Sequence, residues 1–141
     1  GESPVEAPSR PPLDALDVAD LHSEAAHPYE LFHATQAHHA VEQTWRGARQ
    51  IADGARRRRS PERLELGLEP GGILIARVGS SEPAVLTVRI DGQGVGALAL
   101  EGAEWQEVTL ALARTIGSGR GRVELEPNGP LFTSMHYWSY R

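Results

Sequence analysis

Residues 86–95 have the sequence Leu-Thr-Val-Arg-Ile-Asp-Gly-Gln-Gly-Val. Apolar and polar side chains alternate from Leu86 to Asp91, which is the period of a β-strand with one buried face. Asp91-Gly92 then stands between two apolar runs, and an Asp-Gly pair in that position is a strong local signal for a β-hairpin. This stretch therefore predicts two antiparallel strands joined by a tight turn.

The same alternation recurs on both sides of this hairpin, across residues 62–140. Its apolar positions are Leu64, Leu66 and Leu68, then Val108, Leu110 and Leu112, then Val123 and Leu125. Residues 73–78 are more continuously apolar and predict a central strand covered on both faces. Connectors rich in Gly, Pro and polar residues separate these segments, with no long helical pattern between them. The predicted fold class is all-β, an antiparallel β-sandwich or jelly roll with a less regular N-terminal segment.

The last segment of this run is aromatic. Strict alternation over residues 131–140 places Phe132, His136, Trp138 and Tyr140 on one face, and Leu131, Met135 and Tyr137 on the other. Neither face is polar, so the strand is either central and covered twice, or it presents an open aromatic platform. We favour the covered strand, because aromatic residues in such a row are usually core residues.

The platform alternative would suit a sugar ligand, because aromatic rings stack on the apolar faces of sugars while their polar edges form hydrogen bonds. The candidate ligand-binding residues are His136, Trp138 and Tyr140 on this strand, with Trp105 as a further anchor. Trp105 is out of phase with the apolar positions of its own predicted strand, so we expect a bulge there or a position at the strand entrance.

Composition bounds the class of protein. A chain of 141 residues is long enough for one domain, which we place at residues 13–141. Residues 1–12 contain four prolines and predict a flexible lead. The chain has no cysteine, and its net charge of −5 argues against a nucleic-acid partner. No apolar run reaches the length of about 18 residues that a membrane-spanning helix needs.

The N-terminal third has no single pattern. Residues 13–22 would suit either a helix or an edge strand, and the secondary structure of residues 30–50 stays open. This third also contains five histidines, which lie near three acidic residues: His22, His27, His33, His38 and His39, with Asp17, Asp20 and Glu24. Such a density could bind zinc, and Asp17 with Asp20 could contribute to a calcium site. The spacing matches no metal motif, so we expect no cofactor and keep calcium or zinc as the alternative.

The run Arg56–Arg59 predicts an exposed loop, because four like charges repel one another. Such a loop could recognise anionic lipid, phosphate or an acidic glycan, although a solvated loop is the simpler interpretation. For catalysis the sequence offers little. Ser134 and His136 share a strand face without an evident acidic partner, and there is no G-x-S-x-G motif, so we predict no catalytic residues and a protein that is not an enzyme.

Three blocks carry a resemblance to a known class of domain. They are residues 17–29, residues 88–92 with 105–108, and residues 132–138, which reads Phe-Thr-Ser-Met-His-Tyr-Trp. Together they resemble the extracytoplasmic β-sandwich domains of bacterial membrane proteins such as membrane glycosyltransferases, domains that look like carbohydrate-binding modules. The resemblance implies a location in the periplasm or at the cell surface and association with a parent membrane protein.

Our leading hypothesis is a non-catalytic extracytoplasmic β-sandwich that serves as a binding or accessory module, with a glycan or another cell-envelope polymer as ligand. The first alternative is a structural protein–protein interaction domain of a larger membrane-associated protein. The second alternative is a metal-dependent enzyme that uses the histidine-rich segment 22–39.

Overall fold

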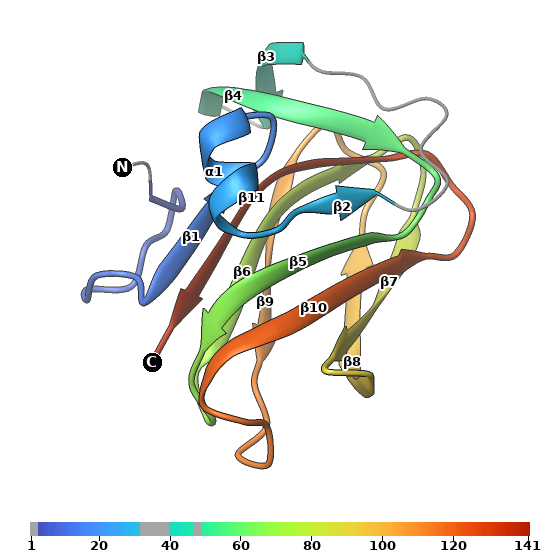
Figure 1. Cartoon of the computed structure of the whole chain (residues 1–141). Coiled ribbons are helices and arrows are strands. Elements are labelled where there is room, and N and C mark those ends of the chain that lie inside the picture. The colour runs from blue at the N-terminus through green and yellow to red at the C-terminus, as the bar shows by residue number, and fades with distance from the viewer. Residues whose placement is uncertain (1–2, 32–39, 47–48) are drawn as a thin grey trace.

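The structure, a computed structural model, describes residues 3–31, 40–46 and 49–141. Two antiparallel sheets lie face to face (Figure 1). The first sheet has the strand order β3 (Ala40–Arg46), β4 (Arg49–Arg58), β11 (Phe132–Tyr140), β6 (Ile73–Ser80) and β9 (Gln106–Ala111), with β1 (Asp14–Asp17) paired to β11. The second has the order β2 (Glu30–Leu31), β5 (Glu62–Leu68), β10 (Gly119–Pro127), β7 (Ala84–Ile90) and β8 (Gln93–Leu100). One short helix, α1 (Leu21–Ala26), follows β1, and the predicted all-β sandwich is confirmed.

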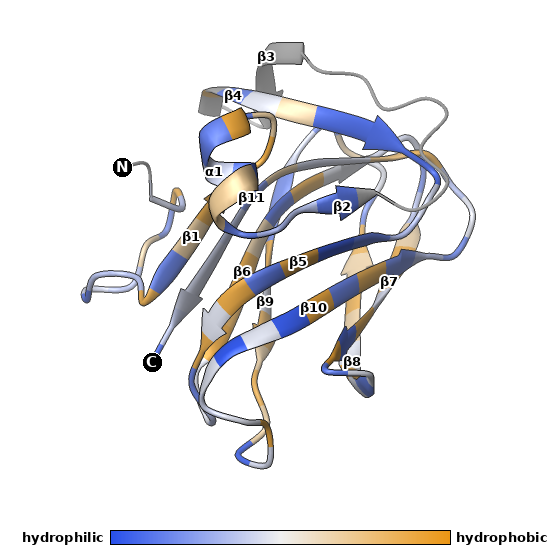
Figure 2. Cartoon of the chain, viewed as in Figure 1, coloured by the Kyte–Doolittle hydropathy of each residue, from blue (hydrophilic) through white to orange (hydrophobic). Residues whose placement is uncertain are grey.

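The core between the sheets consists of the alternating apolar side chains that the sequence pattern predicts. Leu64, Leu66 and Leu68 of β5 are fully buried, while Arg63 and Glu65, which alternate with them, are not. Orange and blue segments alternate along β5 and β10 in Figure 2 for this reason. β6 lies between β11 and β9, and residues 74–80 are all buried, so the strand predicted to be covered on both faces is confirmed.

The predicted hairpin is formed by β7 and β8. Ile90 pairs with Gln93 across a two-residue turn in which Asp91 has φ 51° and Gly92 has φ 85°. Two successive positive φ angles are typical of a type I′ turn, whose twist matches that of the flanking strands. Gly92 adopts this conformation without steric cost, and Asp is among the residues that tolerate it.

A β-bulge in β11 decides which aromatic side chains face the core. Ser134 pairs with Val78, but the next paired residue is His136, opposite Arg77, so Met135 is an extra residue. A bulge shifts the alternation by one position. Phe132 and Tyr137 therefore face the inter-sheet core. Met135, His136, Trp138 and Tyr140 face away from it, on the side that we call the outer face of the first sheet.

Strict alternation was thus wrong for two residues. It placed Phe132 with Trp138, and Met135 with Tyr137, whereas the structure places Phe132 with Tyr137 in the core and Met135 on the outer face. The reason is the single inserted residue, because hydrophobic periodicity cannot locate a bulge inside a strand whose two faces are both apolar.

A buried polar network lies at one end of the core, around Glu62. Its carboxylate accepts hydrogen bonds from the hydroxyls of Tyr29, Ser134 and Tyr137, and it forms an ion pair with Arg58. Arg58 also donates to Ser134 Oγ at 2.6 Å. Burial raises the pKa of Tyr137, so this phenol stays protonated and can donate to Glu62.

The arginine run is part of a strand and not an exposed loop. β4 continues to Arg58, and its alternation turns consecutive arginines to opposite sides. Arg58 is buried, Arg56 is half-buried and donates to both carboxylate oxygens of Glu24 at 2.7 and 2.8 Å, and Arg57 and Arg59 are exposed. The prediction of four exposed charges was therefore wrong, because two of them meet carboxylates that the local pattern could not place beside them.

The sequence pattern of residues 13–22 suited either a strand or a helix, and the structure has both in this region, β1 and α1. β1 pairs with residues 136–139 of β11, on the same edge where residues 132–134 pair with β4. Asp20 then caps α1, because its carboxylate accepts from the backbone N–H groups of His22 and Ser23. Within the residues 30–50 that sequence could not assign, residues 40–46 form strand β3, and residues 32–39 lie outside the described residues.

His27 ties α1 to β1. Its Nδ1 lies 2.8 Å from the carbonyl oxygen of Ser23, and its Nε2 lies 2.8 Å from Asp14 Oδ1. Both partners are acceptors, so both hydrogen bonds form only with the imidazolium. Asp14 Oδ2 in turn accepts from the Gly67 N–H at 2.7 Å, which connects β1 to the second sheet.

The lead lies against the body of the sandwich. Pro4 is buried, whereas most other residues of the lead are exposed. Its backbone meets the outer face of the first sheet, where Val5 N–H donates to Glu107. The flexibility predicted for residues 1–12 stays a prediction. No helix in the part of the chain that the structure describes has the length and apolar character to cross a membrane.

We expect Arg58→Met to lower the free energy of unfolding by about 3–5 kcal/mol, because it leaves the Glu62 carboxylate buried without its cation. Arg59→Met makes the same chemical change at an exposed position and should cost no more than about 0.5 kcal/mol. Urea unfolding of both variants measures the difference, and equal midpoints would contradict the structural role of Arg58.

Acid should weaken the attachment of β1. Burial opposes ionisation of Asp14, but hydrogen bonds from Gly67 and His27 outweigh it and lower the pKa of this carboxyl. A lowered pKa stabilises the fold above the unfolded-state value, and this stabilisation is lost as the pH falls through the folded-state value. Asp14→Asn should therefore cost about 1–3 kcal/mol at pH 7 and progressively less below about pH 4.

Chemical denaturation at a series of pH values tests this expectation. Glu82→Gln is the matched control, because Glu82 is exposed, and it should follow the wild-type pH dependence. A constant difference between Asp14→Asn and the wild type across pH 3–7 would show that the Asp14 charge contributes nothing.

Candidate functional site

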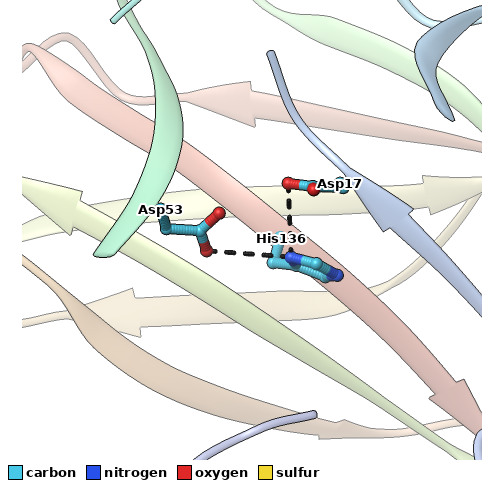
Figure 3. Close-up of side chains that lie close together, drawn as sticks. All are labelled: Asp17, Asp53 and His136. Atoms are coloured by element: carbon cyan, nitrogen blue, oxygen red, sulfur yellow. Dashed lines mark ion pairs between the residues drawn. The ribbon is translucent and has the colours of Figure 1, made fainter. Parts of the chain in front are cut away.

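Three side chains from distant parts of the chain converge on the outer face of the first sheet: Asp17 from β1, Asp53 from β4 and His136 from β11 (Figure 3). His136 Nδ1 lies 3.5 Å from Asp17 Oδ1 and 3.7 Å from Asp53 Oδ2. Asp17 is opposite His136 in the strand register, so the pairing of β1 with β11 sets this contact. The bulge at Met135 turns His136 outward to meet it.

Arg77 of β6 extends this group into a larger network. Its Nη1 lies 2.8 Å from Asp53 Oδ2, and its Nη2 lies 3.0 Å from Glu107 Oε2. The guanidinium carbon lies 5.0 Å from the ring centroid of Trp138 and 5.8 Å from that of Trp105. One buried cation therefore joins two carboxylates and two indole rings, a combination in which charge-assisted hydrogen bonds and cation–π contacts act together.

Two flat groups contact the Trp138 ring. The His136 ring stacks on it with centroids 4.1 Å apart and an interplanar angle of 12°, and the Arg77 guanidinium approaches its ring as well. Tyr140 lies two residues further along the same side of β11 and packs with Trp138 and Ile75. The structure thus brings together the residues that the sequence singled out on the last strand.

These residues do not form an open platform. The exposed fractions are 3% for His136, 0% for Trp138, 0% for Tyr140 and 3% for Trp105. The covered-strand interpretation is confirmed, and the open-platform alternative was wrong: the Arg77 guanidinium lies over the rings of Trp138 and Trp105, and the Arg10 guanidinium lies over Tyr140. A role for the four residues in ligand binding stays a prediction. We call Asp17, Asp53, Arg77, Glu107, His136 and Trp138 the outer-face cluster.

The electrostatics of the cluster differ between its two aspartates. Burial, followed by the neighbouring charge of Asp53, raises the pKa of Asp17 to about 6, although His136 opposes the rise. Asp53, in contrast, lies against the Arg77 guanidinium. The raised pKa lets Asp17 take up a proton in mildly acidic solution, where an ordinary aspartate stays ionised.

His22 and His27, the two histidines of the histidine-rich segment that the structure describes, do not belong to the group that could hold a metal. Among the described residues, His22 is exposed and His27 is engaged by Ser23 and Asp14, while His33, His38 and His39 lie outside the described residues. The predicted pairing of Asp17 with Asp20 is replaced by Asp17 with Asp53, and Asp20 caps α1 instead.

The donor set of Asp17, Asp53 and His136 fits calcium poorly. Calcium takes six to eight oxygen ligands, and this group offers two carboxylates and an imidazole. One imidazole and two carboxylates suit zinc better, but the Arg77 guanidinium already lies against Asp53. The structure therefore places a positive charge of the protein itself next to the carboxylate that a metal ion would need.

The sequence did not identify Arg77, Asp53 or Glu107. One signal was present: Arg77 is the single charged residue in the apolar stretch 73–78, and a charge in a strand covered on both faces requires a buried partner. No local signal pointed to Asp53 or Glu107, because their position next to Arg77 depends on strand order.

Comparison with known proteins supports the fold. No family model matches the chain, and no curated protein sequence matches it either. Among solved structures, the carbohydrate-binding module CBM6cm-2 of Cellvibrio mixtus lichenase 5A, in complex with cellotriose, is 14% identical, with 93% of this chain and 98% of that chain covered and a TM-score of 0.58. A carbohydrate-binding module CBM36 in complex with calcium and xylotriose is 13% identical, with coverages of 88% and 96% and a TM-score of 0.52.

A third structure is an enzyme, the glycoside hydrolase family 43 arabinoxylan arabinofuranohydrolase from Bacillus subtilis in complex with cellotetraose. It is 18% identical with a TM-score of 0.50, and 81% of this chain matches only 28% of that chain. Identities this low show the fold alone. The chain has the antiparallel β-sandwich fold of carbohydrate-binding modules.

Proposed function

We propose that this protein is a non-catalytic module that binds a glycan or a similar cell-envelope polymer through the outer face of the first sheet. The observation that carries the proposal is the group formed by Trp138, His136 and Arg77: the His136 ring stacks on Trp138, and the Arg77 guanidinium lies over the same indole while Asp53 and Glu107 pair with it. An aromatic ring beside paired donors and acceptors is what recognition of a sugar requires, because a sugar has apolar faces and a rim of hydroxyl groups.

The shared fold supports the ligand class. The two carbohydrate-binding modules whose structures resemble this chain hold cellotriose and xylotriose. These oligosaccharides are therefore the first probes to use.

The state of the carboxylates supports a role without catalysis. A glycosidase needs two carboxyl groups that flank the scissile bond, one to donate a proton and one to act as nucleophile or base. In the outer-face cluster, Asp53 and Glu107 both form ion pairs with Arg77. Both carboxylates are engaged in holding this guanidinium in place.

An extracytoplasmic location and a parent membrane protein remain predictions that rest on the resemblance of the sequence blocks. Both agree with a glycan-binding role, because polymers of the cell envelope are found outside the cytoplasm.

Arg77→Lys should weaken the binding of cellotriose or xylotriose about tenfold or more, which corresponds to about 1.4 kcal/mol. Lysine keeps the charge but loses the planar fork that holds Asp53 and Glu107 and stacks on Trp138. The matched control is Arg89→Lys, since Arg89 forms an exposed ion pair with Glu126 on the second sheet.

Isothermal titration calorimetry at millimolar sugar measures both affinities, and circular dichroism confirms that both variants are folded. Equal affinities for the two variants would place the binding site elsewhere on the protein. Absence of binding to these sugars and to insoluble cell-wall polysaccharides would overturn the glycan-binding proposal itself.

We also expect binding to be independent of divalent metal ions, because Arg77 supplies positive charge beside Asp53. Affinity measured after dialysis against EDTA should equal the affinity measured with added calcium or zinc. A loss of affinity in EDTA that either ion restores would show that a metal takes part in binding.

A further inference from the structure

The lead makes specific contacts with the outer-face cluster. The Val5 N–H lies 2.8 and 3.1 Å from the two carboxylate oxygens of Glu107. The carbonyl oxygen of Ser3 accepts a long hydrogen bond of 3.5 Å from Arg77 Nη2. Pro4, between these two residues, is buried. The lead therefore engages the same guanidinium and the same carboxylate that hold the cluster together.

A second contact lies at the other end of the face. Arg10 Nε donates to the carbonyl oxygen of Arg141 at 3.0 Å, and its guanidinium carbon lies 5.7 Å from the ring centroid of Tyr140. Between Val5 and Arg10 most side chains of the lead are exposed. The lead is thus held at two points, one beside Arg77 and one over Tyr140.

The chemistry of these contacts is that of a small polar ligand. A backbone carbonyl faces an arginine and a backbone N–H faces a carboxylate, so one segment both accepts and donates within three residues. A sugar with neighbouring hydroxyl groups offers the same pair of functions, because each hydroxyl can donate and accept. The buried proline adds an apolar ring between the two polar contacts, in the way that the face of a sugar does.

The lead is also held weakly enough to be displaced. No strand pairing fixes residues 3–12, and most side chains between Val5 and Arg10 are exposed. A segment with few buried contacts and an exposed backbone opens at low free-energy cost. Opening would release Ser3 and Val5 from Arg77 and Glu107, next to Trp138, and would remove the Arg10 guanidinium from the Tyr140 ring.

We propose that residues 3–10 are an internal ligand that covers the glycan-binding face and competes with glycan for Arg77 and Glu107. This inference rests on the proposed function and adds a mechanism that controls it. The association constant of the full chain then equals that of the uncovered face multiplied by the fraction of molecules in which the lead is displaced. Release of the lead, by cleavage or by contact with the parent protein, would strengthen binding.

The test uses the full chain with Val5→Pro, which removes the N–H that Glu107 accepts and keeps an apolar side chain of similar size. Ala7→Pro makes the same backbone change at an exposed residue and serves as the matched control. Arg10→Gln is a second variant, which removes the cation over Tyr140. Acrylamide quenching of tryptophan fluorescence reports release of the lead, with Trp138→Phe in the same background to assign the change.

We expect Val5→Pro and Arg10→Gln to increase quenching and to strengthen cellotriose or xylotriose binding about fivefold or more, while Ala7→Pro changes neither. If the wild type binds these sugars and both variants bind them with equal or lower affinity, the internal-ligand proposal is overturned and the glycan-binding proposal stands. Absence of sugar binding in every variant, including those with raised quenching, would overturn both.

Discussion

The buried guanidinium of Arg77 is the interaction on which the outer face of the first sheet depends. It meets Asp53 from β4 and Glu107 from β9, and it forms cation–π contacts with Trp138 from β11 and with Trp105. Four strands of one sheet are thereby joined through a single side chain. A cation in this position requires carboxylate partners, because burying a charge without a partner would greatly lower the free energy of unfolding. The other side of the sheet packs against the second sheet mainly through apolar side chains, with the Glu62 network at one end.

Much of the architecture follows from local sequence. The Asp91-Gly92 turn and the alternation of residues 64–68 each specify a strand through nearby residues alone. The failures have one physical origin. The bulge at Met135 and the buried position of Arg58 depend on which strand lies alongside, which is decided by residues distant in sequence. The alternation of apolar and polar residues assigns side chains to the faces of a strand where one face is polar. It cannot assign them where both faces are apolar.

The candidate site was predictable only in part. The aromatic residues of the last strand were candidate site residues because aromatic rings can stack on sugars, and His136 and Trp138 do stack on each other. Their partners Asp53 and Glu107 carry no local signature, because a single acidic residue on a strand is ordinary. The cover over these rings could not be predicted either, since a proline-rich segment makes its contacts through backbone groups and few side chains. The contacts at this face are therefore set by the tertiary structure and cannot be predicted from local sequence.

The position of β11 has a consequence for how the chain acquires its structure. β11 is the last strand in sequence, yet it pairs with β1, β4 and β6 in the middle of the first sheet. A ribosome therefore delivers the central strand after all of its neighbours, and these must wait with unpaired edges until it arrives. Long-range pairings of this kind make folding slow and leave the unfinished chain prone to association with other chains. A chain that stops short of Phe132 therefore lacks the centre of its first sheet.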